Sequence, residues 1–109
     1  MHSGIDIATI NGTPIYATAS GKIIKTNADN SYGGGYGNYV EINHNNTFIS
    51  KYAHCETICV ELNKYVKKGS IIGYVGSTGD SSGNHLHFEI YENDVRVDPL
   101  NYVSYHTKK

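Results

Sequence analysis

The sequence predicts an all-β fold, in the form of an antiparallel β sandwich or a partly open barrel with long glycine-rich loops forming a groove. Three observations support this prediction. Apolar and polar residues alternate in several short segments, as they do in strands that bury one face. The 12 glycines and 10 tyrosines, with no tryptophan, indicate strands joined by tight turns, and helical periodicity is almost absent. Short strands at this spacing are typical of sandwiches and barrels.

Alternation is clearest in five segments, which we expect to form strands. They are GKIIKT (21–26), NYVEINH (38–44), TFISKYAH (47–54), SIIGYVG (70–76) and LHFEIYE (86–92). The clusters of turn-forming residues between them lie at 26–38, 43–47, 66–70, 76–84 and 91–97. Two of these clusters, NHNNT and YENDV, have the composition of hairpin connections. The order of the strands in the sheet does not follow from the sequence.

Length and charge limit the organisation and the partners of the chain. At 109 residues it forms one domain, 1–109, with room for a hydrophobic core. The 9 basic and 10 acidic residues give a net charge of −1, so no basic patch indicates nucleic acid or an anionic membrane. No apolar run is long enough to span a membrane, and no signal peptide opens the chain. Because the chain begins directly against its first candidate functional residue, we expect a domain cut from a longer protein.

Six histidines are many for this length, and four of them stand in three suggestive motifs. His2 and Asp6 lie in HSGID, His54 ends KYAH, and His85 and His87 lie in GNHLHFE. In a strand, residues two apart share a face, so the last two imidazoles should point the same way. Two histidines and one acid with an open water position are a common hydrolytic zinc site. The surplus imidazoles suit acid–base catalysis beside a metal ion.

Each motif also has an ordinary structural interpretation when it is taken alone. His85 and His87 could be a hydrogen-bonded pair that stabilises one face of a sheet. Asp6 could cap a turn through its side chain, and His54 could be an exposed polar residue at a strand end. The combination of the motifs, in their order along the chain, favours the functional interpretation.

From His2 to about Val103 the sequence resembles the lysostaphin/LytM-type peptidoglycan endopeptidases, the M23 metallopeptidases. The motifs that carry the resemblance are HSGID, KYAH and GNHLHFE, in the order of the family, together with the phrases GKI, KKGSIIGYVGSTG and VDP. The resemblance implies that one zinc ion per chain is held by His2, Asp6 and His87. It also implies that His54 and His85 are catalytic imidazoles that do not bind the metal. Strand geometry alone leaves open which member of HLH is the ligand.

The resemblance implies a zinc endopeptidase that cuts the peptide part of bacterial peptidoglycan, with no covalent nucleophile. It also implies an extracytoplasmic location, whether cell-wall-associated, secreted or borne on a phage particle. A second hypothesis is a catalytically inactive relative that binds the cell wall or a partner. Such relatives typically lose a metal or catalytic position, whereas all five candidates are present here. A third, a carbohydrate-binding β domain, rests only on the tyrosine and glycine content and leaves the histidines unexplained.

Two glycine-rich stretches, NSYGGGYGN (30–38) and GSTGDSSGN (76–84), resemble the loops that wall the substrate groove in this family. Glycine permits positive φ and lets an extended peptide approach the backbone closely. The alternative is a pair of long hairpin loops without a ligand. We expect the groove, because the second loop runs directly into His85. Tyr32 and Tyr36 could touch a substrate, but among ten tyrosines neither is assigned that role.

Cys55 and Cys59 follow His54 directly, in HCETIC, and the family more often has an aliphatic residue in place of the first cysteine. A C-x3-C pair supplies too few ligands for a second zinc site, and its spacing is not the usual one. A local disulfide and two free, partly buried thiols remain equally open. His44 and His106 belong to no motif and are expected to be surface residues.

Overall fold

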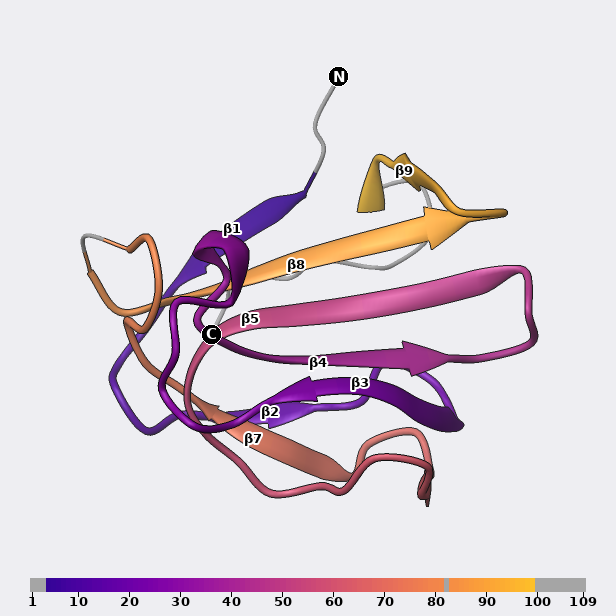
Figure 1. Cartoon of the computed structure of the whole chain (residues 1–109), viewed down its shortest axis with the longest axis horizontal. Coiled ribbons are helices and arrows are strands. Elements are labelled where there is room, and N and C mark those ends of the chain that lie inside the picture. The colour runs from indigo at the N-terminus through magenta and orange to yellow at the C-terminus, as the bar shows by residue number, and fades with distance from the viewer. Residues whose placement is uncertain (1–3, 82, 100–109) are drawn as a thin grey trace.

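The computed structural model describes residues 4–81 and 83–99, and within them the chain is all-β (Figure 1). The strands are β1 (Ile5–Ala8), β2 (Pro14–Tyr16), β3 (Gly21–Asn27), β4 (Asn38–Asn43), β5 (Phe48–Ile58), β6 (Tyr65–Val66), β7 (Ile71–Val75), β8 (His85–Glu92) and β9 (Val95–Val97). A single turn of 3-10 helix, η1 (Gly33–Gly35), lies between β3 and β4. No helix in the described ranges has the length and apolar character needed to cross a membrane.

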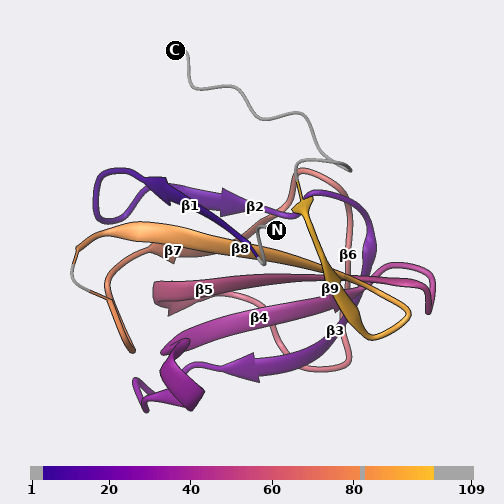
Figure 2. The same ribbon diagram turned by 90° about the horizontal axis from the view of Figure 1, so that it is seen from above.

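All strand pairs are antiparallel, and the main sheet has the order β1-β8-β5-β4-β3-β6. β9 adds to β8, while β7 joins the end of β5 and pairs with β2. β2 and β3 overlap in Figure 1, but the view from above places them on opposite sides of the molecule (Figure 2). The sheet therefore curls around a core without closing into a barrel, which confirms the predicted all-β, antiparallel class.

The hydrophobic core fills the inner face of this curled sheet. Alternate residues of β4, β5 and β8 point inward, as the period of a strand requires. They meet the β2 and β7 residues in a cluster of Ile15, Ala17, Ile23, Val40, Ile42, Tyr52, Cys55, Ile72, Val75, Phe88 and Ile90. The rings of Tyr52 and Phe88 pack at 5.2 Å between centroids. The intervening residues of β8, among them His87 and Glu89, consequently point to the opposite face of the sheet.

The two cysteines are free, with Cys55 buried and Cys59 exposed, so the disulfide alternative is not the one that the structure adopts. Burial raises the pKa of the Cys55 thiol to about 12, which keeps it protonated and unsuited to metal binding. Cys55 is accordingly a small apolar core residue. The second thiol lies within hydrogen-bonding distance of the Ile71 carbonyl, 3.4 Å away.

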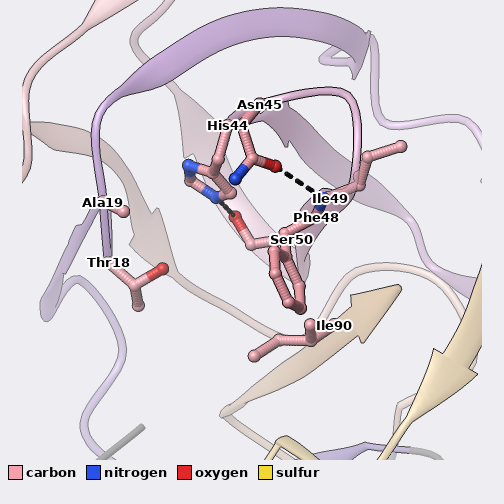
Figure 3. A pocket seen from close by; sticks show the side chains of 8 residues that line it. All are labelled: Thr18, Ala19, His44, Asn45, Phe48, Ile49, Ser50 and Ile90. Carbon is pink, nitrogen blue, oxygen red and sulfur yellow. Dashed lines mark hydrogen bonds between the residues drawn. The ribbon is translucent and has the colours of Figure 1, made fainter. Parts of the chain in front are cut away.

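The expectation that His44 is a plain surface residue is wrong. Its Nδ1 lies 2.8 Å from the Ser20 carbonyl, and its Nε2 lies 2.8 Å from Ser50 Oγ. The ring therefore joins the loop after β2 to strand β5, beside a shallow pocket that Phe48 and Ile90 also line (Figure 3). His106 lies outside the described residues.

Candidate active site

Four of the five predicted site residues meet in one open cleft of about 350 Å³. Asp6 comes from β1, His54 from β5, and His85 and His87 from β8. These three strands are neighbours in the order β1-β8-β5, and the register sets Asp6 directly opposite His87. The cleft is lined by Asp6, Gly34, Gly35, Tyr36, His54, Asp80, His85, His87, Glu89 and Arg96. His2, the fifth candidate, lies outside the described residues.

His87 lies between two carboxylates in the cleft. Its Nδ1 lies 2.7 Å from Asp6 Oδ1, and its Nε2 lies 2.7 Å from Glu89 Oε2. A carboxylate accepts hydrogen bonds and cannot donate them when ionised. The hydrogen bond to Glu89, followed by that to Asp6, raises the pKa of the His87 imidazole despite its partial burial. The arrangement is that of an imidazole whose two nitrogens both face negative charge.

The contacts of the two His87 nitrogens indicate whether this ring could bind a metal ion. A neutral imidazole carries one hydrogen, so only one of the two His87 nitrogens can donate to the carboxylate that it faces. With the hydrogen on Nε2, toward Glu89, a lone pair on Nδ1 points at Asp6. That lone pair and Asp6 Oδ1, at 2.7 Å, repel each other unless a cation binds both. A proton satisfies the pair by making the ring an imidazolium, and a metal ion satisfies it as a shared ligand centre. A histidine that binds a metal ion through one nitrogen usually donates the hydrogen of its other nitrogen to a carboxylate or carbonyl oxygen. Glu89 is placed to accept such a bond from Nε2. The Asp6–His87 pair therefore fits as two of the ligands of a divalent metal ion.

Among the described residues, no group of three or more His, Cys, Asp and Glu side chains is arranged to hold a metal ion. Asp6 and His87 are two members of the predicted ligand set, and the third, His2, lies outside the described ranges. The side chain of Asp6 is 66% exposed and that of His87 is 19% exposed, so the pair opens to solvent at the mouth of the cleft.

His54 has an unusual backbone conformation. Its φ of 63° lies in the left-handed region, which residues other than glycine rarely adopt. The register between β4 and β5 shifts at this point, so a β-bulge turns the His54 side chain toward the cleft. The backbone N–H of His54 donates to the Tyr36 carbonyl at 2.8 Å. Strain of this kind is often found at functional sites, where the surrounding structure holds it in place.

The His54 ring is oriented by a second hydrogen bond. Nδ1 lies 2.7 Å from the Thr78 carbonyl, which can only accept, so Nδ1 carries the hydrogen and Nε2 is a free acceptor. Burial lowers the pKa of His54, and the bond to Thr78 offsets this only in part. The ring is therefore neutral near pH 7 and suited to accept a proton.

The His85 ring packs beside the His54 ring in the cleft, with 4.7 Å between the ring centroids. Its Nδ1 lies 2.9 Å from the Gly83 carbonyl and 3.2 Å from Ser81 Oγ, both in the second glycine-rich loop. Its Nε2 lies 3.5 Å from Asp6 Oδ1, against 2.7 Å for His87 Nδ1. The structure thus sets His87 closer than His85 to the acidic candidate ligand.

Both glycine-rich loops contribute to the cleft, as expected. Gly34 and Gly35 come from the first loop and Asp80 from the second. The loops also contact each other, because the Asp80 N–H donates to the Gly35 carbonyl at 2.8 Å. Sequence reasoning did not assign Glu89, although its position two residues after His87 on the same strand face was a usable signal. It also left Tyr36 unassigned, and no sequence signal distinguishes this tyrosine from the others.

The chain is similar to a known family of proteins over nearly its whole length. Residues 1–99 match the profile of Peptidase family M23. The peptidoglycan DD-endopeptidase ShyC of Vibrio cholerae is 41% identical over 98 residues, which are 90% of this chain and 22% of that protein. The murein hydrolase activator NlpD of Escherichia coli K12 is 44% identical over 102 residues, which are 94% of this chain and 26% of that protein.

Among solved structures, a zinc-containing peptidase of Vibrio cholerae superposes with a TM-score of 0.79 at 38% identity, covering 88% of this chain and 28% of that one. The chain thus spans about a quarter of the length of these three relatives. The relatives thus include one named an endopeptidase and one named a murein hydrolase activator. The profile match over nearly the whole chain, on a fold with the same architecture, places this chain in the M23 peptidase family.

Proposed function

We propose that this chain is a zinc-dependent endopeptidase domain that hydrolyses peptide bonds in bacterial peptidoglycan, outside the cytoplasm. The observation that carries the proposal is the convergence of Asp6, His54, His85 and His87, from three strands, on one cleft. Membership of the M23 family supports it, as does the similarity to ShyC, which is named a peptidoglycan DD-endopeptidase.

His2, Asp6 and His87 would hold one zinc ion per chain. When bound, zinc lowers the pKa of its water toward about 7 and polarises the scissile carbonyl. His54 presents Nε2 as an acceptor for the proton of the attacking water. His85, whose ring centroid lies 4.7 Å from that of His54, can stabilise the developing oxyanion or protonate the leaving amine once it is charged. The two glycine-rich loops let an extended peptide approach the backbone closely.

The test of this function is digestion of purified peptidoglycan. We expect the protein loaded with one equivalent of zinc to release soluble peptide-containing fragments. A chelator should stop the release, and added zinc should restore it. Mass spectrometry of the fragments, with identification of the new amino terminus, gives the bond that is cut. A zinc-loaded, folded protein that releases nothing from several peptidoglycan types contradicts the proposal.

A second candidate is an activator domain without activity of its own. The 44% identity to NlpD, which is named a murein hydrolase activator, favours it. An activator would leave peptidoglycan intact when added alone and would raise the rate of a separate murein hydrolase. The same digestion, run with and without a separate purified murein hydrolase, separates the two functions.

We expect activity to fall on the acid side of neutrality because His54 must be neutral to accept a proton. Burial lowers the pKa of His54 below its ordinary value of 6.5, so the ring stays neutral down to mildly acidic pH. The rate attributable to this group should therefore be constant above pH 6.5 and should decline as pH falls through the lowered pKa. Initial rates of fragment release between pH 4.5 and pH 8, with zinc occupancy measured at each pH, check this. A rate that does not change with pH contradicts the prediction, as does an acid-side decline whose midpoint lies above pH 7.

A further inference from the structure

Glu89 is a charged side chain buried directly behind the cleft. It follows His87 by two residues on β8 and lies on the same face of the strand. Only 1% of its surface is exposed. A buried carboxylate is costly unless hydrogen bonds or an opposite charge compensate the lost water. The position therefore requires an explanation in terms of its partners.

The Glu89 carboxylate is surrounded by hydrogen-bond donors. Oε2 accepts hydrogen bonds from His87 Nε2 at 2.7 Å, from the Tyr36 hydroxyl at 3.0 Å and from Arg96 Nη1 at 3.4 Å. Oε1 receives the Tyr91 hydroxyl at 2.7 Å. The hydroxyls of Tyr36 and Tyr91 donate to this carboxylate, and the Arg96 guanidinium adds a permanent positive charge, so the position favours the ionised form. The carboxylate is consequently an anion that only accepts hydrogen bonds.

The partners on either side keep this anion in place. The Lys51 ammonium lies 3.3 Å from the centroid of the Tyr36 ring and 3.4 Å from Glu41 Oε2. The face of the tyrosine ring therefore packs against a buried ion pair. The Lys51 side chain is itself only 9% exposed. Tyr36 thus has little freedom to move its hydroxyl away from Glu89, and the carboxylate has little freedom to turn away from His87.

We propose that Glu89 is the positioning residue of this site, holding His87 with its hydrogen on Nε2 and its Nδ1 directed at Asp6, ready for a metal ion. The inference rests on the proposed zinc site. It adds to that site the atom of His87 that would bind the metal, Nδ1, and the carboxylate that would orient the ring, Glu89. Partners of this kind typically change metal affinity 10–100-fold when they are removed.

The test is Glu89→Gln, which keeps the volume of the side chain and removes its charge. We expect the Kd for zinc, measured by competition with a chelator of known affinity, to rise 10–100-fold. Tyr91→Phe is the matched control, because it leaves the carboxylate and removes a donor at Oε1, the oxygen that His87 does not contact. We expect its Kd to rise less than tenfold. Thermal melts of both variants define the folded fraction used in each titration.

A merely structural role predicts a different result, in which both variants melt at lower temperature and bind zinc with the affinity of the unsubstituted protein. That result overturns the inference. Long-range ¹H–¹⁵N NMR of the unsubstituted, zinc-loaded protein tests it without any variant. A hydrogen on Nε2 of His87 supports the inference, and a hydrogen on Nδ1 overturns it. The NMR result decides the matter even where Glu89→Gln does not fold.

The outcomes also separate this inference from the proposed function. Failure of the unsubstituted protein to bind one equivalent of zinc overturns both. Stoichiometric zinc without digestion of peptidoglycan overturns only the enzymatic activity, and the affinity comparison still supports or overturns the role of Glu89. Digestion with an unchanged Kd in Glu89→Gln overturns only the role of Glu89.

Discussion

His54→Ala and His85→Ala should each lower the rate of peptidoglycan digestion about 10²–10⁴-fold, the usual effect of removing a positioned acid–base group. Zinc content should stay near one per chain, because neither ring belongs to the Asp6–His87 pair that faces the proposed metal position. Initial rates of fragment release, divided by the folded fraction from thermal melts, give the change in turnover. Metal analysis of the same samples gives the zinc content.

Two further histidine variants serve as controls. His87→Ala should lose both zinc and activity, because two remaining protein ligands hold the metal poorly. His44→Ala removes a half-buried histidine at the opposite end of β5 from His54, so the rate should follow the folded fraction alone. Loss of zinc in His85→Ala with retention in His87→Ala would show that the two roles within HLH are inverted. Parallel loss of stability and rate in every variant would show that the histidines act as core residues only.

The fold class and the long strands could be predicted because each carries its own period-2 pattern. β3, β4, β7 and β8 lie within one or two residues of the predicted segments, and β5 runs four residues further, to Ile58. β1, β2, β6 and β9 were not predicted, and β9 falls in a segment read as part of a turn. These strands have two to four residues, too few to display a period, and pairing with a longer neighbour stabilises them. β1, β2 and β6 pair with strands that are distant in the sequence, and such pairing cannot be predicted from a local pattern.

The candidate site was predicted as a set of residues but not as a geometry. Motif order identified Asp6, His54, His85 and His87, and the register of β1, β8 and β5 then brings them together. The left-handed backbone of His54 could not be predicted, because it depends on a bulge that forms only when β4 pairs with β5. The burial of Glu89 likewise depends on the assembled sheet. The period of the strand places Glu89 on the same face as His87, but its burial cannot be predicted because it depends on the tyrosines that cover it.

Gly37→Ala should destabilise the protein and separate the two loops of the site. Gly37 has a φ of 65°, and a Cβ there would lie 2.4 Å from the Thr78 carbonyl carbon and 2.5 Å from the Gly79 nitrogen. These are backbone atoms, so no side chain can turn aside. The left-handed conformation costs alanine about 1–2 kcal/mol, and overpacking typically adds about 1–3 kcal/mol. Since about 1 kcal/mol shifts the Tm of a domain of this size by roughly 4–8 °C, thermal melts resolve the two terms.

Gly69→Ala, in the turn between β6 and β7, is the matched control. Its φ is 85°, and a Cβ there would meet nothing within 4 Å, so only the conformational cost applies. We expect Gly37→Ala to melt roughly 4 °C or more below Gly69→Ala. We also expect Gly37→Ala to lose more turnover than its folded fraction explains, because moving Thr78 removes the carbonyl that orients the His54 ring. Equal melting temperatures would show that the loops can separate freely. A lower Tm with full turnover per folded molecule would show that the loop contact stabilises the fold without positioning His54.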